Sequence, residues 1–489
     1  MTGVPIACHL PDIPVYKQER AMNADLVHNQ SLEEMDIRCM LHPATSIADH
    51  LANGPRIIAE GSGVHLTDTK GRRYLDGAAG LWCVNVGYGR QEIADAIAEQ
   101  AAKLPFYHSF NSMANEPSIR LADRILRWAP DGMSKAIFGS GGSDANDTNV
   151  KLVWYYNNLR GLPRKKKIIS RKCAYHGVTV ASGSLTGLPV FHDKFDLPLP
   201  MIRYTHAVDQ YREKPAEMSE AEFTQYLADE LDSLIRAEGP ETVAAFIAEP
   251  VMGTGGVLVP PEGYFEAIQK VLDEHDVLMI ADEVICGFGR LGASFGSQKY
   301  GIRPDLMTMA KGLSSAYLPI SASVISDKIW TVLEETAPQM AAFGHGFTYS
   351  AHPTCAAAAL ANLDIIEREN LVANAASAGA KLKARLDDAL GDHPMVGDIR
   401  GEGLMIGVEM VADRQSRAMI DLSHKAGPRV LKRGFEEGIL VRALPNGNVI
   451  ALSPPLIISD DEIGELVSGL TRAIDHVHGE LVGENAVSG

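Results

Sequence analysis

Two carboxylates follow directly on an apolar stretch of this sequence. The segment VLMIADEVICGFGR, residues 277–290, reads as a buried strand that ends at Asp282 and Glu283. Ligands of open α/β sheets bind outside the carboxyl ends of the strands, so Asp282 stands where a functional carboxylate would be placed. The residue could instead be an ordinary strand-end carboxylate that caps the next turn.

A lysine ends a second apolar stretch. In LMTMAKG, residues 306–312, Lys311 follows residues that are typical of a buried strand. Burial disfavours the ammonium form of a lysine, and the neutral amine is a nucleophile. Most lysines are simply solvated, but this position makes Lys311 a candidate amine nucleophile.

A glycine-rich turn stands between a predicted strand and a predicted helix. Its sequence is FGSGGSDAND, residues 138–147. Free N–H groups at a helix N-terminus bind phosphate well, and small residues allow a ligand to approach closely. The segment could also be a plain tight turn in which Ser143 or Asp144 caps the helix.

The same turn approximates the GxSxG motif of serine hydrolases. Ser143 would then be the nucleophile, and His345 or His352 could act as its base. Ala145 replaces the last glycine of that motif, so the match is incomplete. A serine hydrolase that needs no cofactor therefore stays as an alternative function.

Short apolar runs alternate with helical segments through the middle of the chain. The runs are residues 136–138, 167–170, 243–248, 277–281, 306–309 and 320–325, and helical periodicity is clear at 92–103, 147–158 and 264–273. This alternation predicts an α/β fold with a mostly parallel central sheet that helices cover on both faces. After about residue 345, long helices and then short strands predict a smaller α+β lobe.

Composition excludes several classes of protein. The chain has 489 residues, with 45 Lys and Arg against 62 Asp and Glu, a formal charge of −17. So acidic a protein is a poor binder of nucleic acid or anionic membrane, and no apolar run approaches the roughly 18 residues that span a bilayer. The N-terminal sequence does not read as a signal peptide. Six scattered cysteines argue against a zinc site or a disulfide framework. We therefore expect a cytoplasmic enzyme without a metal.

A strand-end aspartate, a strand-end lysine and a phosphate-binding turn are together what pyridoxal 5'-phosphate requires. The sequence resembles the class III pyridoxal-phosphate aminotransferases of fold type I along essentially its whole length. The segments that carry the resemblance are GLWCVNVGYGR (80–90), SGGSDANDT (140–148), AYHG (174–177), AEPVMGTGG (248–256), ADEVICGFGRLG (281–292), AKG (310–312), GFTYSAHP (346–353) and SPPL (453–456). The first and the seventh of these are most similar to the ω-amine and putrescine:pyruvate transaminases.

The resemblance implies a role for each matched residue. Lys311 would be the Schiff-base lysine and Asp282 the partner of the pyridine nitrogen. Tyr175 and Val284 would pack on the two faces of the cofactor ring. Gly142 and Ser143 would hold its phosphate. Glu249 would lie near the cofactor, with a buried structural carboxylate as the alternative. Trp82 would form a wall of the substrate pocket, unless it is a core tryptophan.

The resemblance also implies a fold, an assembly and a domain division. Thr348 would reach the cofactor phosphate of a neighbouring subunit, which makes a homodimer necessary for a complete site. Residues 76–344 would form a large cofactor-binding domain and residues 345–489 a C-terminal small domain. Residues 1–75 would be an N-terminal segment that joins the small domain.

One departure from the family bears on the substrate. Ornithine- and GABA-type members carry EPIQGE, whose last glutamate pairs with an arginine just ahead of the late PPL segment. The corresponding residues here are Thr254 and Ala451, which disfavours enzymes that use 2-oxoglutarate through that pair. Arg442, in the predicted loop VRALPNGNV, is the remaining candidate to bind a carboxylate, although it could be an ordinary solvated arginine.

The function that the resemblance implies is ping-pong transamination. A primary amine (an ω-amine, a diamine or an ω-amino acid) would donate its amino group, and a keto acid, with pyruvate expected, would accept it. A pyridoxal-phosphate aminomutase or decarboxylase of the same fold would share every cofactor residue. Such enzymes differ in whether the amino group moves between two molecules.

Overall fold

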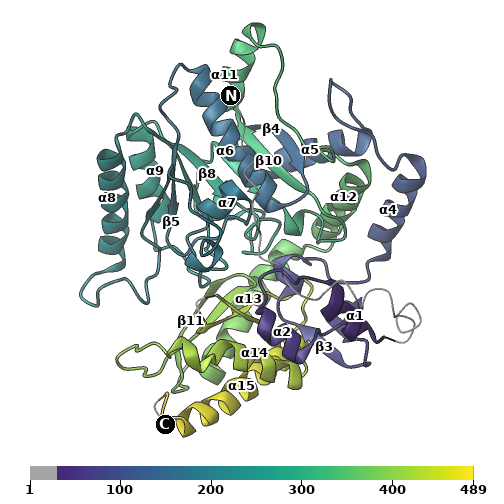
Figure 1. The fold of residues 1–489 in the computed structure, drawn as a ribbon, viewed down its shortest axis with the longest axis vertical. Helices are drawn as coiled ribbons and strands as arrows, with labels where there is room; N and C mark the ends of the chain where they lie inside the picture. Colours follow the sequence, from purple (N-terminus) through teal and green to yellow (C-terminus); the bar gives the residue numbers. More distant parts are fainter. Residues whose placement is uncertain (1–29, 446, 488–489) are drawn as a thin grey trace, which may run out of the picture. The chain divides into compact units, whose positions relative to one another are not determined.

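The computed structural model describes residues 30–445 and 447–487 (Figure 1). By its internal contacts the chain divides into two units. Of the described residues, one unit contains 30–60 and 67–71, and the other contains 61–66 and everything from 72 onward. The part of the predicted segment 1–75 that precedes residue 30 lies outside the described residues.

The first unit contains two short helices, α1 (Leu32–Cys39) and α2 (Ile47–Asn53). Ser31 and Glu34 form a capping box at the start of α1, and the Ser46 side chain accepts a hydrogen bond from the Asp49 amide at the start of α2. Neither helix has a buried residue. Strand β1 (Ile58–Ser62) follows.

A seven-stranded sheet forms the centre of the second unit, in the order β4-β10-β9-β8-β7-β5-β6. Its strands are β4 (Met133–Gly139), β5 (Lys167–Arg171), β6 (Ile202–Thr205), β7 (Val243–Ala248), β8 (Leu278–Asp282), β9 (Leu306–Met309) and β10 (Ser321–Ser326). Strands β5 to β9 pair in parallel, and β10 is antiparallel to β4 and β9. The predicted mostly parallel sheet is confirmed. Strand β6 was missed because it is a short edge strand with two of its four residues only partly buried.

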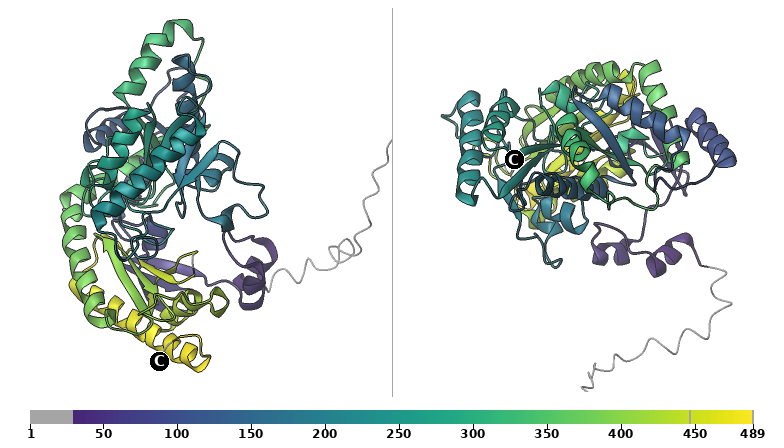
Figure 2. Two further views of the ribbon diagram at one scale, coloured as in Figure 1. Left: turned by 90° about the vertical axis from the view of Figure 1, so that its left-hand side faces the viewer. Right: turned by 90° about the horizontal axis from the view of Figure 1, so that it is seen from above.

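Helices cover both faces of this sheet, as predicted (Figures 1 and 2). The helices of this part of the chain are α4 (Gln91–Lys103), α5 (Glu116–Trp128), α6 (Gly142–Leu159), α7 (Val180–Leu185), α8 (Glu220–Glu238), α9 (Tyr264–Glu274), α10 (Gly296–Lys299), α11 (Asp327–Thr336) and α12 (Pro353–Arg368), after the kinked turn α3 (Ala79–Trp82). Ile247 of β7 joins a core with Val153 of α6, whereas the next residue back, Phe246, joins a core with Phe223 of α8 and Phe265 of α9. Successive strand residues point to opposite faces, so a strand buried on both faces reads as a continuous apolar run.

The C-terminal part of the chain forms a second, smaller sheet with the order β11-β12-β15-β14. Its elements are β11 (Val396–Glu402), β12 (Met405–Met410), β14 (Arg442–Ala443), β15 (Val449–Leu452), α13 (Leu371–Leu390), α14 (Ala426–Glu436) and α15 (Asp460–Gly483). Strand β13 (Ile439–Leu440) pairs in parallel with β3 (Arg73–Asp76), which follows β2 (His65–Asp68). The described helices include none with the length and apolar composition of a membrane span.

Candidate active site

The carboxyl ends of β8 and β9 and the start of α6 meet at one cavity. Its lining residues are Leu81, Trp82, Gly142, Ser143, Tyr175, His176, Gly177, Glu249, Thr254, Asp282, Val284, Ile285, Lys311 and Arg442. Every residue that the sequence analysis placed in the site is among them, except Thr348. A larger cavity of about 360 Å³, lined among others by Tyr211 and Arg417, contains none of the predicted site residues.

Asp282 is the last residue of β8, and its side chain is held in place by hydrogen bonds. Asn146 donates through Nδ2 to Oδ2 at 2.9 Å, and the backbone amide of Val284 donates to Oδ1 at 3.1 Å. His176 Nδ1 lies 2.8 Å from the same Oδ2. This contact of His176 with Asp282 was not predicted from the sequence. Asn146 was missed as well, because no periodicity links it to a strand end 136 positions away.

The neighbouring carboxylate, Glu283, points away from the cavity. It accepts hydrogen bonds from the amide of Gly296 at 3.0 Å and from the hydroxyl of Ser297 at 2.6 Å. Burial raises the pKa of Glu283 to about 7. Asp282 therefore faces the cavity alone, and Glu283 braces the chain behind it.

Lys311 follows β9 and opens a short 3-10 turn, with a left-handed φ of 47°. Its Nζ lies 5.3 Å from the centroid of the Trp82 ring. A small part of the side chain stays accessible from the cavity, but the surrounding protein desolvates the amine, and this burial lowers the pKa of Lys311. At a given pH, more of this lysine is therefore neutral and nucleophilic than of a solvated lysine.

The glycine-rich turn opens helix α6 at the cavity, with Gly142 and Ser143 in its lining. The Asp144 side chain accepts hydrogen bonds from the amides of Ser140 and Gly141, just before the helix. The first amides inside the helix have no intrahelical partner, as at the start of any α-helix. The close packing requires glycine, since a Cβ at Gly142 would come within 2.9 Å of Val284 Cγ2. The helix starts earlier than the predicted 147–158, because its first residues have a sequence that is typical of a turn.

Glu249 supports the loop that carries Tyr175. Its Oε1 accepts the Tyr175 amide at 3.1 Å, and its Oε2 accepts the Gly253 amide at 2.7 Å. Burial raises the pKa of Glu249. These contacts match the structural alternative for Glu249, because both carboxylate oxygens hold backbone amides at the cavity wall.

Arg442 and Trp82 form the other wall of the cavity. Arg442 lies in strand β14, not in a loop as predicted, and its guanidinium carbon is 4.3 Å from the Trp82 ring centroid. Among the described residues its buried Nη1 has no hydrogen-bond partner. Ala451 is the residue opposite Arg442 in β15, and Thr254 lines the same cavity. The cavity thus contains a guanidinium with an N–H donor that no described residue accepts, and residue 254 is a threonine, not a glutamate.

Two further sequence predictions can be placed. Thr348 is exposed on a turn and does not line the cavity of its own chain. His345, the possible base for Ser143, lies with its Nε2 2.9 Å from Thr148 Oγ1 and its Nδ1 2.8 Å from Lys151 Nζ. Both ring nitrogens are therefore occupied elsewhere, and His345 gives the serine hydrolase no base.

The groups in the cavity fit pyridoxal phosphate. The helix start and Ser143 suit a phosphate, Asp282 suits a protonated ring nitrogen, and Lys311 suits an aldehyde. Tyr175 and Val284 both line this cavity, where an aromatic and an apolar side chain could pack on a planar ring.

Comparison with known proteins agrees with this chemistry. The family described as aminotransferase class-III matches residues 47–474. The diaminobutyrate–2-oxoglutarate transaminase of Halomonas elongata is 48% identical, over 94% of this chain and 99% of its own. The mitochondrial gamma aminobutyrate transaminase 1 of Solanum lycopersicum is 44% identical, over 89% of this chain and 84% of its own. An omega transaminase from Pseudomonas jessenii, solved in complex with PMP, superposes with a TM-score of 0.90 at 47% identity, over 93% of this chain and 99% of its own. The chain therefore belongs to the class III aminotransferases, which are pyridoxal-phosphate enzymes of fold type I.

Proposed function

We propose that this aminotransferase transfers the amino group of a primary amine, whether an ω-amine, a diamine or an ω-amino acid, to pyruvate. The observation that carries the proposal is the position of Arg442, whose unpaired Nη1 is buried in the same cavity as Lys311. A keto acid brings a carboxylate into that cavity, and a planar guanidinium can bind it through two charge-assisted hydrogen bonds.

The chain's own residues would divide the work as follows. Pyridoxal phosphate, when bound, supplies an aldehyde that bonds to amines and a ring that stabilises negative charge on the adjacent carbon. Asp282, fixed by Asn146 and His176, would keep the ring nitrogen protonated. Lys311 Nζ would take the proton from the substrate carbon and return it at the next step, as general base and then general acid. The lowered pKa of Lys311 favours the form that accepts a proton.

Pyruvate is proposed as the acceptor because this chain lacks a glutamate–arginine pair that binds 2-oxoglutarate in other members of the family. Enzymes of this family that use 2-oxoglutarate through a glutamate–arginine pair need both partners, and the corresponding residues here are Thr254 and Ala451. Ala451 is 1% exposed and lies inside the small sheet. The Halomonas elongata relative is named for 2-oxoglutarate, which makes the acceptor the part of the proposal that most needs measurement.

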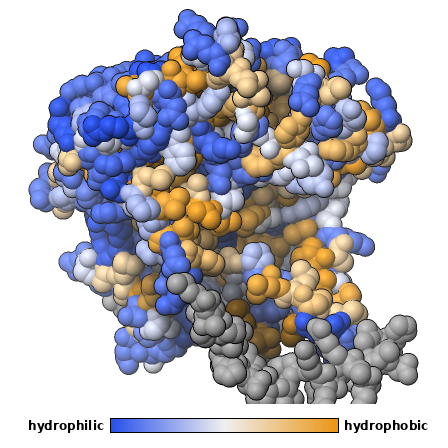
Figure 3. All heavy atoms as spheres, turned by 45° about the horizontal axis from the view of Figure 1, so that its top comes forward, coloured by the Kyte–Doolittle hydropathy of each residue, from blue (hydrophilic) through white to orange (hydrophobic). Residues whose placement is uncertain are grey.

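A homodimer completes the proposal. Thr348 would contribute to the cavity of a second copy of the chain. Large apolar side chains are exposed on the segment that carries Thr348, residues 343–349, and on a second segment, residues 107–113. They are Tyr107 (44%), Phe110 (43%), Met113 (48%), Phe343 (41%) and Tyr349 (62%). The two segments are in contact, since Ser109 Oγ donates to the Ser350 carbonyl and the Phe106 and Tyr349 ring centroids are 5.8 Å apart. Apolar residues are prominent on the face drawn in Figure 3. Exposed apolar surface of this kind is typical of an interface.

We extend the proposal to the domain division. Residues 76–344 would form the large cofactor-binding domain and 345–489 the small domain, which residues 1–75 join. The parallel pairing of β3 with β13 supports this division, because it links a segment before residue 77 to the C-terminal part of the chain. The cytoplasmic location stays a prediction.

The acceptor and the reaction class can be tested together. Each donor of an amine panel is labelled with ¹⁵N and incubated with pyruvate or 2-oxoglutarate, and kcat/KM and the labelled amino-acid product are measured. We expect labelled alanine, with a higher kcat/KM for pyruvate. A higher kcat/KM for 2-oxoglutarate would contradict the acceptor. Label that moves to another carbon of the donor would indicate an aminomutase. Release of CO₂ from the donor would indicate a decarboxylase.

A further inference from the structure

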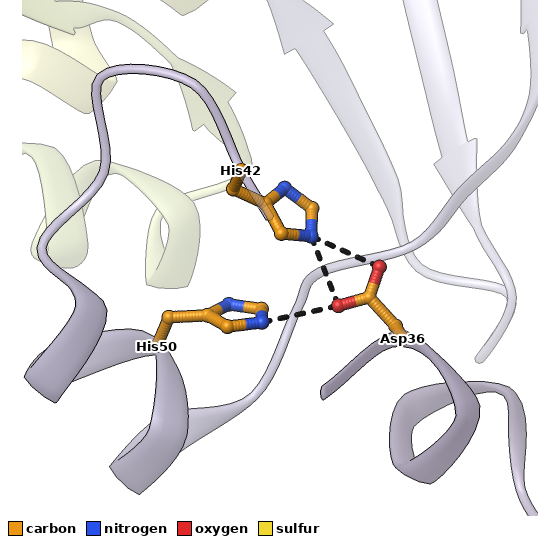
Figure 4. Close-up of side chains that lie close together, drawn as sticks. All are labelled: Asp36, His42 and His50. Carbon is orange, nitrogen blue, oxygen red and sulfur yellow. Dashed lines mark hydrogen bonds and ion pairs between the residues drawn. The ribbon is translucent and has the colours of Figure 1, made fainter. Parts of the chain in front are cut away.

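Three side chains of the first unit converge on one point (Figure 4). Asp36 comes from α1, His50 from α2, and His42 from the segment that connects the two helices. His42 Nε2 lies 2.9 Å from both carboxylate oxygens of Asp36, and His50 Nε2 lies 3.1 Å from Asp36 Oδ1. Two imidazole nitrogens and a carboxylate thus face one another, and all three side chains are at least partly buried.

We propose that Asp36, His42 and His50 form a binding site for a divalent transition-metal ion, with Zn²⁺ as the best match. Imidazole and carboxylate are standard ligands of Zn²⁺. Three protein ligands would leave one position of a tetrahedral site for water. The site shares no residue with the active-site cavity and does not depend on the proposed function.

The distances between the ligand atoms are close to those that a metal requires. In a tetrahedral site with bonds of about 2.0–2.1 Å, neighbouring ligand atoms are about 3.3 Å apart. The nitrogen–oxygen separations here are 2.9–3.1 Å. All the ligand atoms, including the two imidazole nitrogens, lie within 4.8 Å of one another. A metal ion between each imidazole and the carboxylate would therefore lengthen these nitrogen–oxygen separations by only a few tenths of an ångström.

The histidines are not otherwise engaged in a way that would prevent binding. His50 Nε2 is buried and makes no hydrogen bond among the described residues, although Asp36 Oδ1 is near it. Within residues 30–487 the ion pairs of Asp36 are with the two imidazoles, and no lysine or arginine neutralises it. A buried polar nitrogen without a partner is costly, and a metal ion would satisfy it.

A second group of the same residue types shows the contrast. Asp232, Glu274 and His275 are also close together, but Arg236 is placed between the two carboxylates. Its guanidinium donates to Asp232 Oδ2 and to Glu274 Oε1, each at 2.7 Å. That group is an ion-pair network already neutralised by an arginine, so we expect no metal there.

The surroundings of the Asp36 site give a metal ion a structural task. Helices of eight and seven residues are too short to be stable alone, and neither buries a residue. Their large apolar side chains are exposed, as at Leu32 (55%) of α1 and Ile47 (63%) of α2. Apolar burial within the described chain therefore does little to hold α1 and α2 together. The free energy of metal binding to a site formed only in the folded segment stabilises that fold.

No metal was expected from the sequence, because its cysteines form no metal-binding pair. A site of two histidines and one aspartate needs no cysteine. Its ligands are six and eight residues apart in the sequence, across two helices and a turn, and match no standard spacing.

The test measures metal bound to the full-length protein, loaded with pyridoxal phosphate and prepared without a polyhistidine tag. After chelator treatment and dialysis, Zn²⁺ is titrated and quantified by mass spectrometry. Co²⁺ serves as a spectroscopic probe of the coordination. We expect one tightly bound ion per chain. His50→Gln and Asp36→Asn should each weaken its binding at least about 100-fold, the upper range for losing a group that merely orients a ligand.

Two matched variants serve as controls. His476→Gln removes an exposed histidine of α15, and Asp232→Asn removes a carboxylate of the second group. Both should bind Zn²⁺ as the unmodified protein does. The proposal is overturned if the unmodified protein retains no Zn²⁺, or if His50→Gln retains as much as His476→Gln. The cofactor absorbance confirms that each variant is folded.

Hydrogen exchange gives a second readout. Zn²⁺ should slow amide exchange in residues 32–53 of the unmodified protein and leave it unchanged in His50→Gln. Equal exchange with and without Zn²⁺ in the unmodified protein would contradict the structural task of the metal.

Discussion

Replacing Arg442 by alanine should separate the two halves of the reaction. In the structure its guanidinium stacks over Trp82 at 4.3 Å, and its buried Nη1 has no hydrogen-bond partner among residues 30–445 and 447–487. The keto acid carries a carboxylate that can use this donor, whereas an uncharged amine does not. The substitution should therefore harm the keto-acid half-reaction selectively.

The magnitude follows from the contacts that are lost. A charge-assisted hydrogen-bonded contact is worth roughly 1.5–3 kcal/mol, which predicts a loss of about 10- to 100-fold in kcat/KM for pyruvate. The stacking on Trp82 is worth roughly 0.5–2 kcal/mol, but it exists before any substrate binds and affects both halves alike. The ratio of the two losses is thus the informative quantity, and the amine half-reaction should change by about threefold or less.

Single-turnover spectroscopy measures each half on its own. The aldehyde form of the cofactor is converted by a monoamine, and the amine form is converted back by pyruvate or, in reverse, formed with L-alanine. Arg442→Lys is the matched control, because it keeps the charge and loses the planar two-donor geometry. We expect the kcat/KM of Arg442→Lys for pyruvate to lie between the values of the unmodified protein and of Arg442→Ala.

Two results would refute this reasoning. Equal losses in both half-reactions would mean that Arg442 supports the cavity by holding Trp82. No loss in either would mean that another group binds the carboxylate.

Asp282 and Glu283, two adjacent carboxylates, give a further pair of predictions. Asp282→Asn should retain the cofactor but lose about 10³-fold or more in turnover, roughly 4 kcal/mol of barrier, and near-normal turnover would show that Asp282 is only a turn residue. Glu283→Gln, its matched control, should keep most of its turnover, because Glu283 faces Gly296 and Ser297. The raised pKa of Glu283, about 7 against an ordinary 4.5, means that the native protein holds a proton that the unfolded chain releases. Stability should therefore fall as the pH rises, by about 2.5 kcal/mol between pH 5 and pH 8 through this group. Urea unfolding at both pH values should show a smaller fall in Glu283→Gln, and an equal fall would exclude Glu283 as its source.

The sequence predicted the central sheet well because buried parallel strands are continuous apolar runs. The runs at 243–248 and 306–309 match β7 and β9 at both ends. Edges and short strands carry weaker signals. Strand β14 has two residues, and its existence depends on pairing with β15, which no local pattern encodes.

For the active site, the residues at strand ends and helix starts could be predicted from the sequence, because their position in the fold determines their direction. The contacts that orient these residues could not be predicted in this way. His176 and Asn146 reach Asp282 from segments more than 100 positions away, and only the folded chain brings them together. Arg212, in the connection between β6 and α8, likewise forms an ion pair with Glu409 of β12, 197 positions away.

Reduction of the purified protein with borohydride tests the central claim most directly. The hydride fixes the bond between the cofactor and its lysine, and peptide mass spectrometry then locates the added mass. The account predicts that it is carried by Lys311, the desolvated lysine that lines the cavity beside Trp82. Cofactor mass on any other lysine, or a cofactor that is bound but cannot be reduced onto the chain, would contradict it.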